Sequence, residues 1–211
     1  MVRFINLIDH LSTWTGKAFA WCILVLTLGV AYEVFVRYVL RAPTPWAFDI
    51  SYIMYGALFM MAGAYTLSRN GHVRGDVLYR LWPPKVQAGI ELFLYFIFFF
   101  PGVIALVYAG YDYASSSWSY MPFGPAGRRG EISINSPAGI PISPLKTLLP
   151  LAAFMLLLQG IAEVCRCIVC LRSGVWPERL RDVEELDVAL QQHVHKDAAE
   201  VLGERAKGTH T

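Results

Sequence analysis

Charged residues are scarce in this chain, and their scarcity excludes an ordinary soluble domain. Only 16% of the 211 residues are Asp, Glu, Lys or Arg, whereas typical soluble proteins have about 25%. Hydrophobic residues make up 55% of the chain, and its mean hydropathy is +0.44. The net charge of +2 comes from no dense cluster of one sign, so we expect no nucleic-acid partner. The composition predicts an integral membrane protein.

Cysteine and histidine are also rare, which excludes several classes of membrane enzyme. The five histidines lie outside the apolar runs, where they cannot act as axial ligands of a haem inside the membrane. No pair among the four cysteines suits a disulfide-forming catalyst on the oxidising side. Cys165, Cys167 and Cys170 do not converge on one side of a helix, so we interpret them as small buried residues. We expect no cofactor, no metal and no catalytic residue.

Long uncharged runs set the number of membrane crossings. About 20 apolar residues span a hydrocarbon core of roughly 30 Å, and four stretches qualify. We interpret the first as a retained helix rather than a cleaved signal peptide, because three more spans follow it. The predicted fold is all-α, with a membrane domain over residues 1–172 and a tail over residues 173–211. The predicted spans are about 16–40, 47–68, 89–112 and 146–171.

Basic residues near the span ends predict the orientation, because Lys and Arg are retained on the cytoplasmic side. With the N-terminus inside, twice as many basic residues lie on the inner side as on the outer side. This asymmetry predicts that both termini are cytoplasmic. The inner residues are Arg3, Lys17, Arg69, Arg74, Arg80, Lys85, Arg166, Arg172, Arg179 and Arg181, and the outer ones are Arg37, Arg41, Arg128, Arg129 and Lys146.

The segments outside the spans have patterns of their own. Between the second and third spans, Arg74 and Arg80 lie opposite apolar residues, which predicts a short helix in the headgroup plane. Residues 114–144 are rich in Ser, Gly and Pro, and we expect them at the periplasmic face. Apolar residues at helical spacing over residues 178–195 predict an amphipathic cytoplasmic helix. Within the third span, Pro101 predicts a bend.

Charges interrupt the apolar pattern at the outer end of the first helical hairpin. Glu33 precedes Arg37 by four residues, which is the favourable order for an ion pair on a helix. Asp49 falls in the first turns of the second span, where the helix dipole favours an anion, and we expect it to pair with Arg37 or Arg41. Thr44 is predicted to cap the same helix. The pattern predicts a hairpin held together by charges at its outer rim.

Ionisable residues are missing from the predicted span centres, where an uncompensated charge is costly and usually functional. The centres fall near Thr27, Leu58, Pro101 and Phe154. The chain is therefore poorly equipped to move a polar solute alone. As an alternative, Glu33 binds a coupling ion in a small stand-alone carrier that acts as an oligomer.

Two glycines in the second span form a strip of small residues. Gly56 and Gly63 are seven residues apart and each precedes an alanine, so another helix can approach closely there. Packing within the chain's own bundle is one interpretation. Packing against a second protein is the interpretation we prefer.

Short motifs around the spans resemble a known family. "RYVLRAPTPWAFD" (residues 37–49) and "NGHVRGDVL" (residues 70–78) are similar to segments of the small membrane subunit of tripartite ATP-independent periplasmic (TRAP) transporters, the DctQ family. The resemblance extends from about Phe19 to Arg172. It departs from the family at Asp49, where Glu is frequent, and in a longer segment after the third span. The motif positions correspond to Arg37, Tyr38, Trp46, Asp49, His72, Arg74 and Asp76.

The resemblance implies a transport function without a solute site in this chain. It implies a sodium-driven symport system in a bacterial inner membrane that takes up organic acids or related solutes. A large membrane subunit holds the solute and sodium sites, and the small subunit acts as its scaffold. Further expected partners are membrane lipids and a periplasmic solute-binding protein that contacts residues 114–144. A rival hypothesis, an enzyme with a site at His72, Arg74 and Asp76, lacks a nucleophile or metal set.

Overall fold

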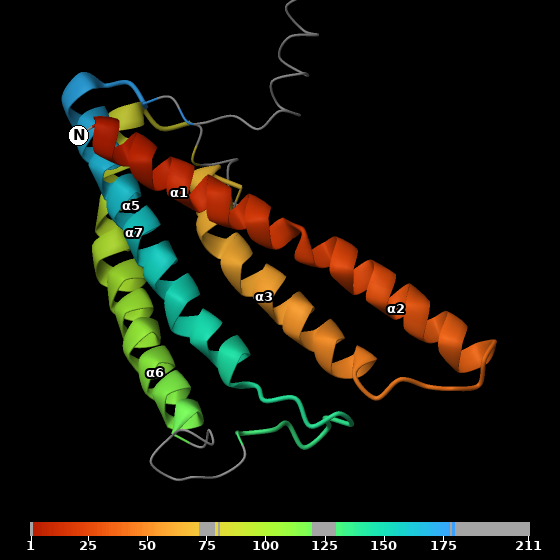
Figure 1. The fold of residues 1–211 in the computed structure, drawn as a ribbon. Coiled ribbons are helices and arrows are strands. Elements are labelled where there is room, and N and C mark those ends of the chain that lie inside the picture. The colour runs from red at the N-terminus through yellow and green to blue at the C-terminus, as the bar shows by residue number, and fades with distance from the viewer. Residues whose placement is uncertain (1, 72–78, 80, 120–129, 178, 180–211) are drawn as a thin grey trace, which may run out of the picture. The chain divides into compact units, whose positions relative to one another are not determined.

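The structure is a computed structural model that describes residues 2–71, 79, 81–119, 130–177 and 179 (Figure 1). The chain divides into two compact units, residues 1–177 and 178–211, and the account below concerns the first. Within the described residues there are helices and no β-strand, only an isolated bridge between Ile132 and Pro141. The elements are α1 (Val2–Ala20), α2 (Cys22–Tyr38), α3 (Ala47–Ser68), α5 (Pro84–Leu94), the π-helical turn η1 (Tyr95–Phe99), α6 (Phe100–Trp118) and α7 (Ser143–Ser173).

In the described part of the chain, four helical segments are long and apolar enough to cross a membrane, which confirms the all-α membrane fold. They are Arg3–Tyr38, Ala47–Ser68, Pro84–Trp118 and Ser143–Ser173. The first segment has 36 residues, and at 1.5 Å per residue it is ~54 Å long, well beyond the hydrocarbon core of roughly 30 Å. A single perpendicular crossing therefore needs only part of this segment.

The first helix begins at Val2, well before the predicted residue 16, and its first part, α1, is amphipathic. Ile5, Ile8, Asp9 and Ser12 are buried, and their spacing places them on one helix face. That face packs against α3 and α7. Because charged residues such as Asp9 and Lys17 interrupt its apolar positions, most of α1 lies outside the uncharged run of the first predicted span.

The third span is interrupted immediately before Pro101. Proline lacks a backbone N–H, and its ring clashes with the carbonyl four residues earlier, here that of Ile97. The π-helical turn Tyr95–Phe99 contains Ile97 and widens the helix at this point. The span then continues as α6, so it is one interrupted helix and not a pair of separate half-helices.

The membrane helices lie side by side in the order α2, α3, α7, α6. Contacts join α2 to α3, α3 to α7 and α7 to α6, while in the described part of the chain no extensive contact joins α2 or α3 to α6. Helix α1 crosses the row and contacts both α3 and α7, as Figure 1 shows. This arrangement does not close into a bundle around a central space.

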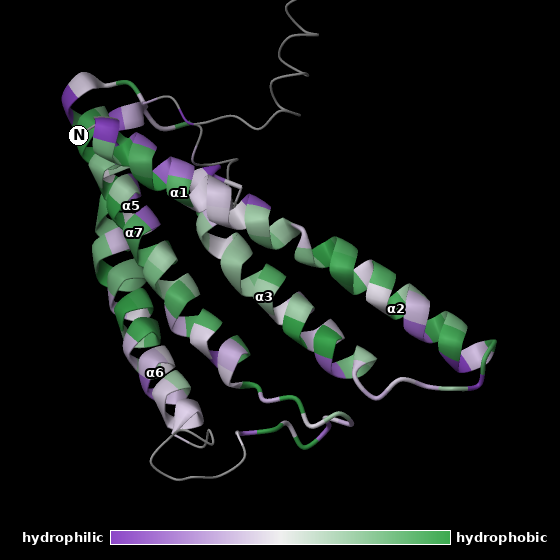
Figure 2. Ribbon diagram, viewed as in Figure 1, coloured by the Kyte–Doolittle hydropathy of each residue, from purple (hydrophilic) through white to green (hydrophobic). Residues whose placement is uncertain are grey.

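Large apolar side chains point away from the other helices, as expected for surfaces that face lipid. Figure 2 shows hydrophobic residues along most of α2, α3, α6 and α7, and hydrophilic residues mainly toward the helix ends and on α1. Leu28, Phe59 and Tyr108 are among the exposed residues. Small residues such as Ala57 and Ala153 are buried between helices instead. Without a hydrophobic driving force between helices in lipid, close approach at small residues supplies the packing.

Gly16 provides a test of this packing. A Cβ atom at Gly16 would lie 2.6 Å from the Cβ atom of Tyr65 on α3, an atom fixed to the backbone. We expect Gly16→Ala to push α1 away from α3 and to lower the free energy of unfolding by about 1–3 kcal/mol. The control is Gly102→Ala, because nothing lies within 4 Å of a Cβ at Gly102. Thermal unfolding in detergent compares the two variants, and equal midpoints would contradict the α1–α3 contact.

Candidate functional site at the two ends of the helix row

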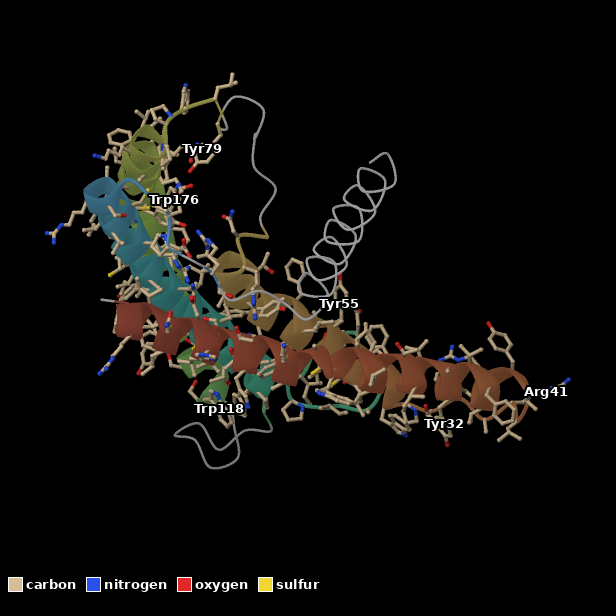
Figure 3. The ribbon with its side chains drawn as sticks, turned by 90° about the horizontal axis from the view of Figure 1, so that it is seen from above. Tyr32, Arg41, Tyr55, Tyr79, Trp118 and Trp176 are labelled. Carbon is tan, nitrogen blue, oxygen red and sulfur yellow. The ribbon has the colours of Figure 1, made fainter. Side chains whose placement is uncertain are left out.

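Polar contacts gather at the two ends of the row. We call the end with the turn 39–46 and the segment 130–142 the loop end. We call the opposite end, where α1 crosses α3 and α7, the base. Figure 3 shows Tyr32 and Arg41 at the loop end and Tyr79 and Trp176 near the base.

Glu33 joins α2 to the turn that follows it. One carboxylate oxygen, Oε1, accepts hydrogen bonds from Arg37 Nε at 3.0 Å and Nη2 at 2.7 Å. The other, Oε2, accepts from the backbone N–H of Thr44 at 3.0 Å and from the Thr44 hydroxyl. The predicted Glu33–Arg37 ion pair is therefore present. Both oxygens of Glu33 are engaged, and the residue is 9% exposed.

The second span, α3, begins later in the chain than a cap at Thr44 would predict. Because the Thr44 hydroxyl donates to Glu33, Thr44 does not cap α3, and this prediction was wrong. The helix begins at Ala47 after Trp46, which makes no side-chain cap. The Trp46 ring stacks on Tyr32 of α2 with ring centroids 6.0 Å apart. Trp46 thus adds an apolar contact to the polar one at Glu33.

Two other motif residues lie at the tip of the same hairpin. Tyr38 and Arg41 are exposed. Arg41 has a φ of 52°, a left-handed conformation that is uncommon for a residue with a side chain. In the described residues neither contributes a polar contact to another helix, so both belong to the turn's outer surface.

Asp49 is buried, but its partners differ from those predicted. Its side chain is 0% exposed, and Oδ2 accepts hydrogen bonds from the Ser136 hydroxyl at 2.7 Å and the Ala138 N–H at 3.2 Å. Arg37 is already paired with Glu33, and Asp49 faces the segment 130–142 instead of the hairpin turn. The prediction that Asp49 pairs with Arg37 or Arg41 was therefore wrong.

The segment 130–142 is held at the ends of α3, α6 and α7. Lys146 Nζ on α7 donates to both carboxylate oxygens of Glu131, at 2.7 and 2.6 Å. The ammonium also lies 3.9 Å from the centre of the Tyr113 ring on α6. The Ile142 N–H donates to the Glu131 carbonyl at 3.0 Å. Part of the segment predicted as an irregular surface loop is thus an ordered strap.

The Glu131 contact predicts a pH dependence. The hydrogen bond from Lys146 lowers the pKa of Glu131 below its usual value of 4.5. A carboxyl with a lowered pKa in the folded state contributes stability above its unfolded pKa and loses it as pH falls through the folded pKa. We expect segment 130–142 to stay attached at neutral pH and to loosen as the pH falls below 4.5 toward the lowered pKa of Glu131. Amide hydrogen exchange of this segment measures the change, and Glu131→Gln should remove its pH dependence.

A buried ionic cluster at the base joins α1 to α7. The Arg166 guanidinium donates to Glu163 from Nη1 and to Asp9 from Nη2. Gln159 Nε2 donates to the second oxygen of Asp9 at 2.9 Å, and the Ser12 hydroxyl donates to Gln159 Oε1 at 2.8 Å. All five residues are at most 1% exposed. We call these residues the base cluster.

Sequence reasoning missed the base cluster, although signals for it exist. Asp9 has the same helical phase as Ile5, Ile8 and Ser12, which would have placed a carboxylate on the buried face of α1. The spacing of Glu163 and Arg166 puts them on one face of an otherwise apolar helix. Arg166 is 23 residues from the start of α7, or ~35 Å along the helix, so the cluster lies near the membrane surface at the base.

A second group of polar contacts at the base packs α5 against α7. Glu91 is buried and accepts hydrogen bonds from the Tyr79 hydroxyl and, at 3.7 Å, from the Cys167 thiol. The Cys170 thiol donates to the Pro84 carbonyl at 3.6 Å. All four cysteines are free, and Cys167 and Cys170 are fully buried. The described residues hold no group of three His, Cys, Asp or Glu side chains that could bind a metal ion.

The two glycines of the small-residue strip have different surroundings. A Cβ at Gly56 would lie 3.1 Å from Leu145 Cδ1 of α7, so Gly56 packs inside the row. A Cβ at Gly63 would meet nothing within 4 Å. Gly63 lines an open apolar hollow. We prefer the interpretation that this strip packs against a second protein. Of the two glycines, only Gly63 leaves space for such a contact.

The remaining predicted sites fall outside the described residues. These are the motif residues His72, Arg74 and Asp76, the predicted interfacial helix around Arg80, and the amphipathic tail helix over residues 178–195.

Comparison with known families identifies the chain's class. A family model for the DctQ component of tripartite ATP-independent periplasmic transporters matches residues 26–170. The match covers the second and third spans, most of the fourth and the last part of the first, and it includes both sequence motifs. No curated protein matches the chain. The matched region contains more than half of the 211 residues, and the chain therefore belongs to the DctQ family of TRAP transporter components.

Proposed function

We propose that this protein is the non-catalytic small membrane subunit of a sodium-coupled TRAP uptake system and acts as a scaffold for the large transport subunit. In this proposal the system takes up organic acids or related solutes across a bacterial inner membrane. The DctQ family is a family of transporter components and not a known family of enzymes. The scaffold role, the sodium coupling and the solute class are the proposed parts.

The arrangement of the spans in a row is the observation that carries the proposal. A carrier encloses its solute near the bilayer midplane, between helices that surround the site. Here the four spans form an open row that α1 crosses at the base, and the hollow beside Gly63 is lined by apolar side chains and Thr66. The Thr66 hydroxyl donates to the Ala62 carbonyl of its own helix. A polar solute would find no polar partner in that hollow.

The polar clusters at the two ends also support a structural role. At the loop end, both oxygens of Glu33 accept hydrogen bonds from within the chain. At the base, Arg166 pairs with both Asp9 and Glu163. Groups that are committed to each other hold helices in place and are not available to a passing ion or solute. A row with two broad lipid-facing surfaces can present one of them to a large partner.

The proposed orientation places the loop end at the periplasm and both termini in the cytoplasm. It follows the distribution of Lys and Arg. The segment 130–142 would then face the periplasm, where a solute-binding protein delivers its cargo. The segment is fixed by the hydrogen bonds of Ser136 and Ala138 to Asp49 and by the Glu131–Lys146 ion pair. It therefore offers a rigid surface to such a partner.

Co-expression with the large subunit of the same transporter tests the scaffold role. We expect the tagged protein to retain the large subunit in mild detergent, and we expect uptake to fall when the small subunit is deleted. As a control, the Gly102→Ala variant should retain the large subunit equally well, because its added methyl group meets no neighbour. Loss of co-purification together with unchanged uptake after deletion would refute the proposal.

A variant of Glu33 separates the scaffold from the stand-alone carrier. In Glu33→Gln the amide can still accept from Thr44 but loses the charge that pairs with Arg37. For a scaffold we expect a lower unfolding free energy, because one charge-assisted contact is weakened, and uptake that persists in proportion to the amount of complex. A coupling carboxylate would lose transport completely at unchanged protein level. Uptake normalised to complex in reconstituted vesicles decides between the two.

A further inference from the structure

Helix α1 has an exposed apolar stripe in addition to the buried face that packs against α3 and α7. Phe4, Leu7, Leu11 and Trp14 are between 39% and 72% exposed. Their alternating spacing of three and four residues places them on one side of the helix. We call these four residues the apolar stripe. Its large side chains need a cover other than water.

A line of basic residues runs beside the apolar stripe. Arg3, His10 and Lys17 are exposed and follow one another at intervals of seven residues, nearly two helical turns, so they lie on one side of α1. The one acidic residue of α1, Asp9, is buried in the base cluster. Helix α1 therefore has three faces: one packed on α3 and α7, one apolar and one basic.

Two contacts fix the depth of α1 relative to the spans. Asp9 pairs with Arg166 of α7, near the membrane surface at the base. The Thr13 hydroxyl accepts a hydrogen bond at 3.4 Å from Nη2 of Arg69, the residue that ends α3. Because α3 and α7 are neighbouring spans, their base ends mark the same membrane surface. Helix α1 passes from one of these ends to the other, so it runs at a shallow angle to that surface.

The three faces exclude an upright α1. Arg3 and Lys17 are fourteen residues apart, or ~21 Å along the helix axis. In an upright helix, Lys17 would lie deep in the hydrocarbon, or else Phe4 and Leu7 would lie in water. A charge in the hydrocarbon and a large apolar surface in water are both unfavourable. A shallow helix avoids both, because the basic line can lie among headgroups while the apolar stripe enters the hydrocarbon.

We propose that α1 is an in-plane anchor that binds the anionic lipid surface at the base. The apolar stripe lies among acyl chains, and the basic line lies among phosphates. An apolar face beside a cationic face matches the two layers of a leaflet, and Trp14 has the amphipathic ring that favours the boundary between them. The base cluster holds the third face, so the anchor sets the depth of the whole row. This inference rests on the membrane location of the chain and not on the proposed scaffold role.

Spin labels on α1 test its depth. The full chain is reconstituted in vesicles of phosphatidylglycerol and phosphatidylcholine, in a background with Cys22→Ala and Cys165→Ala. Labels at Leu7→Cys and Trp14→Cys lie seven residues apart, or ~10 Å along the helix axis. We expect both labels to collide with dissolved oxygen and to lie at nearly the same depth. A depth difference of about 10 Å would show an upright helix and would overturn the proposal.

Labels at Leu28→Cys and Phe35→Cys are the control, because they are also seven residues apart but lie on α2, which crosses the membrane. Their depths should differ by more than those of the α1 pair. A label at Asn6→Cys, on the basic side of α1, should collide with a water-soluble nickel complex instead of oxygen. If binding of the large subunit shields the labels at Leu7→Cys and Trp14→Cys from both reagents, a protein covers the stripe and the proposal fails.

A fluorophore at Leu11→Cys tests the role of charge. Its quenching by phosphatidylglycerol with a spin label in the acyl chain should exceed its quenching by phosphatidylcholine with the same label. Replacing Arg3 and Lys17 together by Gln should lower the ratio of the two quenching constants several-fold, since each cation near the surface attracts anionic lipid roughly fivefold. Arg41→Gln should leave the ratio unchanged, because Arg41 is exposed at the loop end. An unchanged ratio in the Arg3 and Lys17 variant would contradict the binding of an anionic surface.

Discussion

Replacing Arg166 by Met is expected to lower the free energy of unfolding by about 3–5 kcal/mol, because it leaves buried carboxylates without their counter-charge. Arg166 is fully buried and donates to both Asp9 and Glu163. Methionine approximates the length of the aliphatic stem, so the change mainly removes the charge. The expected result is detachment of α1 from α7, since Asp9 is the charged link between them.

Two measurements check the Arg166 prediction. Thermal unfolding in detergent should show a lower midpoint, and limited proteolysis should cleave α1 earlier than in the wild type. Arg172→Met is the matched control, because Arg172 lies on the same helix but is exposed. A variant with Arg166→Met, Asp9→Asn and Glu163→Gln together should regain part of the loss, because no buried charge then remains among these three positions. An Arg166→Met protein that melts like Arg172→Met would contradict the role given to the base cluster.

The contacts that could be predicted from the sequence are local ones. Glu33 and Arg37 lie four residues apart on one helix, so their pairing follows from helix geometry alone. The spans follow from run length and hydropathy, and both are properties of short windows. The family resemblance rests on motifs that surround these windows, which is why it could be recognised before the fold was known.

The contacts that were missed connect distant parts of the chain. Asp9 and Arg166 are separated by 157 positions, and their pairing depends on α1 crossing α7. The uncharged run of the first span does not reach the start of α1, because Arg3, Asp9 and Lys17 interrupt the apolar residues there. Asp49 was assigned to the nearest arginines in the sequence, whereas its partners lie 87 and 89 positions away. Sequence proximity is a poor guide once a residue sits at the end of a helix, where several segments meet.

Removal of the Asp49 carboxylate is expected to release the segment 130–142 from the loop end. In Asp49→Ala the Ser136 hydroxyl and the Ala138 N–H lose their shared acceptor. Both donors are only part-buried, so the freed segment satisfies them with water, and the net loss is that of hydrogen bonds to a charged acceptor, about 1.5–3 kcal/mol. We expect faster amide exchange at residues 136–140 and a lower unfolding free energy by about that amount, while the membrane helices stay intact.

Two further variants show whether Asp49 acts through these hydrogen bonds or through its charge. Asp49→Asn keeps an acceptor oxygen and should preserve much of the protection of Ala138. Asp112→Ala removes an exposed carboxylate from α6 and should leave amide exchange in the segment unchanged. If Asp49→Ala and Asp112→Ala gave the same exchange rates, Asp49 would not hold the strap. If Asp49→Asn resembled Asp49→Ala instead, the negative charge at the start of α3, and not the acceptor for Ser136 and Ala138, would be the property that fixes the segment.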